Sequence, residues 1–121
     1  TSDVVEEQAR EFELALKAAR EIFGERHQLR KWNGNSYERI INRAVFDIVA
    51  YYFSFSQIRQ ASESHADDLK RAFERLCSQN REFLSSLEAT TKSIEANRVR
   101  FSTWAQTLSD VTGLRVESPI R

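Results

Sequence analysis

Hydrophobic residues are densest in one stretch near the middle of the chain, YERIINRAVFDIVAYYFSF at residues 37–55. Its apolar side chains recur at steps of three and four, which places them on one face of a helix. Three further residues widen this face until little of its middle is polar: Val45, Val49 and Phe53. We therefore predict a central helix at about residues 36–55, capped by Asn35 or Ser36 and packed by neighbours on most sides.

A narrower apolar pattern runs through the first part of the chain. Apolar residues alternate at steps of four and three, in the order Val5, Ala9, Phe12, Leu16, Ala19 and Phe23. This single seam predicts a helix from Asp3 to Phe23, with Asp3 and Glu6 as a capping box and Gly24 as the stop. A seam this narrow suits packing against one groove, either in this domain or on a neighbouring one.

The rest of the chain predicts shorter elements. Residues 25–36 form a polar, basic connection, and Asn33-Gly34-Asn35 within it is typical of a turn. The pattern breaks at residues 56–63. We then predict three helices: one from a cap at Ser64 to about Cys77, a short one after a new cap at Ser78-Gln79-Asn80, and a last one from Thr90, Thr91 or Ser93 to Gly113. The tail at 114–121 contains Pro119 and is expected to be a strand or an extended end.

These patterns predict an all-α fold, a compact bundle of four to five helices around the central hydrophobic helix. The 121 residues suit a single helical domain spanning 1–121. The sequence contains no methionine, even at position 1, where a translation product begins with one. We therefore expect the chain to be a fragment of a larger multidomain protein.

Charge is balanced in total but not along the chain. Eighteen basic residues match eighteen acidic ones, so no global field indicates nucleic acid or membrane. Between Arg26 and Arg43, however, five basic residues stand against the single acid Glu38. The candidate contact residues, for nucleic acid or for another domain, are Arg26, Arg30, Lys31, Arg39, Asn42 and Arg43. A solvated loop and helix start, with Arg43 paired to Asp47 four residues on, is the alternative interpretation.

Metal, cofactor and membrane sites find no support in the sequence. The only cysteine, Cys77, allows no internal disulfide and is expected to be a buried, inert thiol. Neither His27 nor His65 has a His or Cys at ligand spacing, so we predict no metal and no cofactor in this chain. No apolar run approaches the roughly 18 residues of a membrane span, and there is no signal peptide. These features fit a cytoplasmic protein that does not contact a membrane.

One enzymatic alternative rests on two Arg–His pairs, Arg20 with His27 and Arg59 with His65. Their spacing is compatible with the Arg–His motif of HEPN-type helical ribonucleases. In such a site an arginine could stabilise a pentavalent phosphate while a histidine moves a proton. Gly24 falls between Arg20 and His27, so one helix cannot hold that pair. The Arg59–His65 pair remains the alternative, beside a plain helical protein-interaction domain.

The start of the central stretch also carries a family resemblance. Residues 37–47, YERIINRAVFD, resemble the R-I-N-[KR]-A-[LV]-F-[DE] signature in the C-terminal helical part of GmrSD-type restriction proteins. These bacterial proteins have an N-terminal domain with a ParB/sulfiredoxin-like fold. The order of the surrounding segments is similar over about residues 9–110: a helix ending in Phe-Gly, a basic loop with an aromatic residue, and a last helix.

The resemblance implies a non-catalytic helical module of a modification-dependent restriction or phage-defence protein. The family's Asp-Gly-Gln-Gln-Arg motif belongs to the ParB-like domain and does not occur in this chain, so no catalytic residue is carried over. The parent protein would be a nucleotide-dependent DNA endonuclease that uses a nucleoside triphosphate and Mg²⁺. The helical module would pack on the parent's N-terminal domain, contact the DNA phosphate backbone, or join protomers in a homo-oligomer.

Overall fold

The computed structural model describes residues 2–88 and 93–120, and within them the chain forms six α-helices and no strand. In order these are α1 (Ser2–Phe23), α2 (Arg43–Phe53), α3 (Ser56–Ser64), α4 (Ala66–Gln79), α5 (Arg81–Glu88) and α6 (Ile94–Thr112). The prediction of an all-α helical bundle is confirmed, with one helix more than expected in the described residues. None of these helices is long and apolar enough to cross a membrane.

The centre of the bundle is α2, as the sequence predicts. Its buried residues are Ala44, Val45, Ile48, Val49, Tyr52 and Phe53. The helix packs against α1, α3, α5 and α6, so neighbours cover most of its circumference. The hydroxyl of Tyr52 remains satisfied in this core, because it donates a hydrogen bond to the Phe101 carbonyl of α6 at 2.8 Å.

The predicted start of the central helix at about residue 36 is wrong, because α2 begins at Arg43. Asn42, not Asn35 or Ser36, is the cap: its Oδ1 accepts a hydrogen bond from the Val45 amide at 3.0 Å. The preceding residues are held in a connecting segment instead. Tyr37 pairs with Trp32 in an isolated bridge, and its hydroxyl donates to Glu74 of α4 at 2.8 Å.

Three smaller expectations are also wrong. Residues 56–63, expected to interrupt the helices, lie in α3, whose buried residues are the polar Arg59 and Ser62. Hydrophobic periodicity cannot detect a helix that is anchored by polar groups. Ser64 does not cap the next helix, since its Oγ donates back to Gln60 and α4 begins at Ala66. Asp3 lies inside the first turn of α1 and not at a cap before it.

Other helix ends follow the sequence signals. Asn80 accepts from the Phe83 amide at 3.0 Å, and Ser93 accepts from the Ala96 amide at 3.1 Å. The alternative caps Thr90 and Thr91 lie outside the described residues. Gly24 and Gly113 both follow a helix with positive φ, at +91° and +80°, which costs glycine little.

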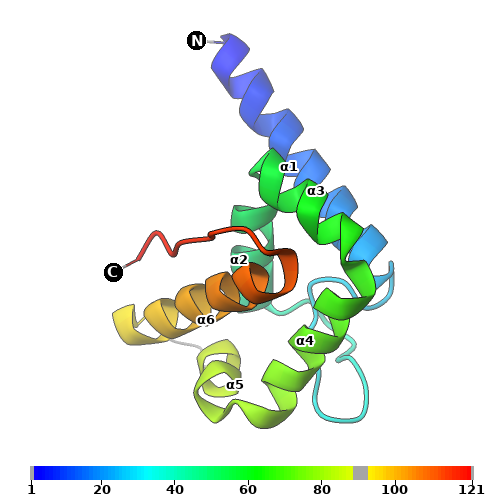
Figure 1. Ribbon diagram of the computed structural model, residues 1–121, viewed down its shortest axis with the longest axis vertical. Helices are drawn as coiled ribbons and strands as arrows, with labels where there is room; N and C mark the ends of the chain where they lie inside the picture. The colour runs from blue at the N-terminus through cyan, green and yellow to red at the C-terminus, as the bar shows by residue number, and fades with distance from the viewer. Residues whose placement is uncertain (1, 89–92, 121) are drawn as a thin grey trace.

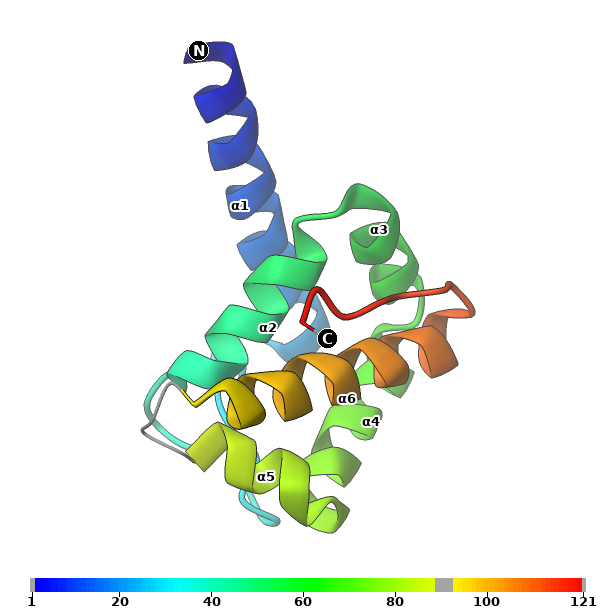
Figure 2. The same ribbon diagram turned by 90° about the vertical axis from the view of Figure 1, so that its left-hand side faces the viewer.

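The tail after Gly113 is extended and turns back along α6, as the two views in Figures 1 and 2 show. Val116 is buried, and its backbone exchanges two hydrogen bonds with the Ser109 hydroxyl, at 3.0 and 3.2 Å. Residues 114–120 form no strand. Of the two expectations for residues 114–121, the extended end is therefore the correct one over the described residues.

The burial of α2 predicts a large effect of truncating Ile48, whose side chain is completely buried. Ile48→Ala should lower the free energy of unfolding by about 2–5 kcal/mol, because it removes buried methyl groups and leaves a cavity. Urea unfolding followed by circular dichroism measures this loss. The matched control is Ile94→Ala, at a position that is 71% exposed. A loss of stability no larger than that of the control would place α2 outside the core.

Candidate interaction surface

The first half of α1 projects from the bundle. We call residues 2–14 the α1 tip; within it, residues 2–10 are all exposed. Figures 1 and 2 both show this part of α1 extending beyond the other helices. The second half of the helix is packed, with Ala15, Ala18, Ala19, Ile22 and Phe23 buried. One continuous helix is therefore half inside the bundle and half outside it.

The apolar seam predicted for α1 continues onto the projecting half. Val5 is 63% exposed and Phe12 is 42% exposed, whereas Ala19 and Phe23 of the same seam are buried. Val4, next to Val5, is also exposed. Large apolar side chains that continue a buried stripe into solvent are typical of a surface that packs on a further partner.

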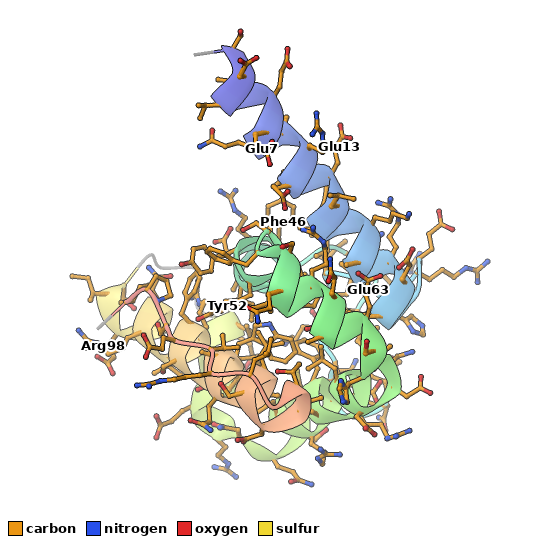
Figure 3. All side chains as sticks on the ribbon, turned by 45° about the horizontal axis from the view of Figure 1, so that its top comes forward. Glu7, Glu13, Phe46, Tyr52, Glu63 and Arg98 are labelled. Carbon is orange, nitrogen blue, oxygen red and sulfur yellow. The ribbon has the colours of Figure 1, made fainter. Side chains whose placement is uncertain are left out.

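The tip is fixed where it leaves the bundle. Glu11 accepts a hydrogen bond from Arg59 of α3 with an Oε2–Nη1 distance of 3.0 Å, and the same Nη1 donates to the Phe53 carbonyl at 2.9 Å. Phe12 contacts Phe46 of α2 with their ring centroids 6.0 Å apart. Figure 3 shows Phe46 near the point where α1 emerges. These contacts join α1 to α2 and α3, and they fix the direction of the tip.

The tip is strongly acidic. Residues 2–14 contain five acidic side chains and one basic side chain, Arg10, which lies 3.9 Å from Glu7. Glu6 and Glu13 are two turns apart and therefore lie on the same flank of the helix. Figure 3 shows the Glu7 and Glu13 side chains extending from the projecting half. The exposed valines and Phe12 are thus bordered by negative charge.

Acidic groups continue along α1 towards α3. Burial raises the pKa of Glu63, and a hydrogen bond with Glu21 and the charge of Glu21 raise it further, while Arg59 and Lys17 oppose the shift. A second carboxylate nearby disfavours the ionised form, which is why Glu21 adds to the effect of burial on the pKa of Glu63.

Two of the six predicted contact residues serve the fold. Lys31 is only 7% exposed, and its Nζ lies 3.1 Å from Glu88 and 3.3 Å from Glu38. Burial lowers the pKa of Lys31, but the hydrogen bonds to both glutamates outweigh it, so the pKa lies above its usual value. Asn42 caps α2 and also donates from Nδ2 to the Leu87 carbonyl of α5 at 3.1 Å. Neither side chain is available for phosphate.

The other four remain at the surface. Arg26 and Arg39 are exposed, and Arg43 is exposed with its Nε 3.3 Å from Asp47, the pair expected from the sequence. Arg30 is half-buried and donates to the carbonyls of Gln28 at 2.8 Å and Arg39 at 3.4 Å. The structure therefore brings Arg30, Arg39 and Arg43 to the segment that leads into α2.

Two exposed isoleucines lie in the same segment. Ile40 is 76% exposed and Ile41 is 53% exposed, between Arg39 and Arg43. We call residues 39–43 the basic patch. Both isoleucines fall within the central helix predicted at about residues 36–55, which was expected to be packed on most sides, so this apolar surface was missed. Asn42, a preferred N-cap directly before an apolar run, was the signal that could have revealed it.

Three residues of the two arginine–histidine pairs make other contacts in the structure. Arg59 is buried and bonded to Glu11 and the Phe53 carbonyl. The Nδ1 of His65 lies 2.9 Å from the Ala61 carbonyl of its own chain segment, and His27 stacks on Tyr37 with ring centroids 4.5 Å apart. Among residues 2–88 and 93–120, no group of three His, Cys, Asp or Glu side chains is arranged to hold a metal.

A groove of about 630 Å³ lies between α4, α5 and α6. Its lining includes Leu76 and Val111, and its four charged residues are all exposed: Arg75, Arg81, Glu82 and Asp110. Asn80, also in its wall, uses Oδ1 to cap α5. Small-molecule sites need buried polar groups that converge on the ligand. The α1 tip is therefore the stronger candidate for a functional surface.

No protein-family model, curated protein or solved structure matches this chain. The interpretation of its surfaces therefore rests on its own residues and geometry.

Asn42 joins two elements, so its removal should cost more than a surface change. Asn42→Ala should lower the free energy of unfolding by about 2 kcal/mol, since it removes an N-cap and a hydrogen bond to Leu87. Asn42→Asp keeps the oxygen that accepts from Val45 but loses the N–H group that donates to Leu87. Its free energy of unfolding should lie between those of the unmodified chain and of Asn42→Ala. Chemical denaturation of the neighbouring variant Arg43→Ala, expected within about 0.5 kcal/mol of the unmodified chain, is the control. Equal stability of Asn42→Ala and Arg43→Ala would contradict this role.

Cys77 should be unreactive in the folded chain. The thiol is buried in α4, and burial raises its pKa to about 11. Since the thiolate is the nucleophile, alkylation by iodoacetamide at mildly alkaline pH should be about 100-fold or more slower than in urea-unfolded chain. Mass spectrometry of quenched samples measures both rates. Similar rates in the two states would show an accessible thiol.

Proposed function

We propose that this chain is a non-catalytic helical docking module, and that the α1 tip is its binding surface. The observation that supports this is the division of one apolar seam. Its second half packs on α2 and its neighbours, while Val5 and Phe12 continue it into solvent on a helix fixed by the Glu11–Arg59 ion pair. A partner that covers the exposed half would bury apolar area without reorganising the bundle.

The family resemblance supplies the proposed setting. The signature residues fall at the start of α2, where Asn42 makes the cap and Arg43 pairs with Asp47. We propose a GmrSD-like modification-dependent restriction or phage-defence protein, in which this module packs on the ParB-like, nucleotide-hydrolysing domain or joins protomers. Nucleoside triphosphate and Mg²⁺ would then bind to that domain and not to the helical module.

Contact with the DNA backbone is a second candidate, supported by the exposed Arg26, Arg39 and Arg43. Such contacts would be to phosphates, sequence-independent and sensitive to salt. Lys31 contributes nothing to them because two glutamates neutralise it. The ribonuclease alternative receives less support, since Arg59 is occupied by Glu11 and a carbonyl.

Hydrogen exchange tests whether the tip is a docking surface. In the 121-residue chain, the amides of residues 5–10 should exchange quickly, because this part of α1 has no packing partner. In a longer protein that includes the ParB-like domain, the same amides should exchange about tenfold or more slowly. The core amides of residues 48–52 are the internal control and should be protected in both.

Equal exchange of residues 5–10 in the two proteins would contradict docking on that domain. If the gene encodes a protein longer than this chain, the resemblance expects an Asp-Gly-Gln-Gln-Arg type motif in the added sequence. A protein without a ParB-like domain would contradict the proposed role in a restriction protein. The α1 tip could then still be tested as a surface that binds other protomers.

A further inference from the structure

Two charged surfaces of this molecule are only partly used by its own fold, and they complement each other. The α1 tip, residues 2–14, has five acidic residues and one basic residue. The region from Arg26 to Arg43, which ends in the basic patch, has five basic residues and one acidic residue. The two regions are therefore opposite in sign. Lys31 is buried and paired with Glu38 and Glu88, so the exposed positive charge comes from the arginines.

Their apolar residues are complementary too. The tip exposes Val4, Val5 and Phe12, bordered by glutamates, and the basic patch exposes Ile40 and Ile41, bordered by arginines. An apolar centre with a charged rim is the usual composition of a specific protein interface. Opposite charges around that centre would favour one mutual orientation and discourage contact between surfaces of the same sign.

The tip cannot reach the basic patch of its own chain. In Figures 1 and 2 the tip lies at one end of the long axis, while the connection that leads into α2 lies in the opposite half. The tip is part of a continuous helix, and Glu11–Arg59 and Phe12–Phe46 contacts fix its direction. The two surfaces can therefore meet only between molecules.

We infer that copies of this chain associate head to tail, with the α1 tip of one copy on the basic patch of the next. The inference rests on the proposed function of the tip as a docking surface and names its partner. Pairing of two tips is disfavoured, because Glu6 and Glu13 of one helix would face the acidic flank of the other. A contact between two different surfaces forms a closed ring or an open chain of copies.

This contact is small and depends on charge. Few apolar side chains take part, so the association of isolated chains is weak and strengthens when copies are held close together. Exposed charge pairs are screened by salt. Arg43 enters the contact with Asp47 beside it, which reduces its contribution.

Sedimentation equilibrium of the full 121-residue chain tests the inference. At low salt the average mass should rise with protein concentration, and high salt should return it to that of the monomer. Glu6→Lys with Glu13→Lys should abolish the rise, and so should Arg39→Glu with Arg43→Glu. All four changes in one chain should restore it, because the signs are exchanged on both surfaces and the net charge returns to zero.

Matched controls separate this contact from general effects. Ile40→Ser should abolish association, whereas Ile94→Ser, at a similarly exposed position outside both surfaces, should not. Asp67→Lys with Asp110→Lys changes the net charge as much as the tip variant does and should leave association intact. Circular dichroism confirms that each variant is folded.

A chain that remains monomeric at every concentration and salt would overturn the inference. So would association that survives both pairs of charge reversals. Duplex DNA is the competing occupant of the patch: binding of DNA that is lost in Arg39→Glu with Arg43→Glu, from a chain that stays monomeric, would assign the patch to phosphates. Neither result changes the outcome of the hydrogen-exchange test of the α1 tip. Head-to-tail association and docking of the tip on the ParB-like domain can therefore fail separately.

Discussion

The burial of α2 is the constraint on which the rest of this structure depends. A helix of 11 residues is too short to be stable in water alone, so its helical form must come from packing. Ile48 and Phe53 are fully buried, and four other helices supply the surfaces that cover them. Each of those helices must therefore turn its packing side towards α2. The side chains that do not pack on α2 or on another helix form the outer surface.

The Arg59–Glu11 ion pair holds α1 in a fixed direction relative to the bundle. Arg59 is buried, and a buried guanidinium is costly unless its charge is paired and its N–H groups are bonded. Glu11 and the Phe53 carbonyl meet that requirement from α1 and from the end of α2. The pair thereby links three helices at the point where α1 leaves the bundle. The direction of the tip follows from an interaction that hydrophobic patterning does not reveal.

The sequence predicted what hydrophobic periodicity controls. The all-α class, the second half of the central helix and the caps at Asn80, Ser93 and Gly113 were predicted from spacing and cap chemistry. The start of α2 was not predicted correctly. Ile40 and Ile41 extend the apolar pattern towards the N-terminus, but Asn42 caps the helix, which therefore begins after them. Lys31 and Asn42 looked like contact residues because their partners, Glu88 and the Leu87 carbonyl, lie more than 40 positions away. The interface between copies and the setting in a restriction protein remain proposals.

The tip differs from a flexible tail because it is already helical. Its nine exposed residues, 2–10, extend about 13 Å beyond the packed half of α1. The buried half of the same helix supplies the nucleus, so the tip propagates an existing helix and does not have to form one. A partner that covers Val5 and Phe12 therefore meets a prearranged row of side chains and loses little conformational entropy on binding. Because the apolar area is small, the proposed docking would depend on the glutamates beside it. The chain is neutral in total, but its acidic α1 tip and its basic patch lie on separate parts of the molecule.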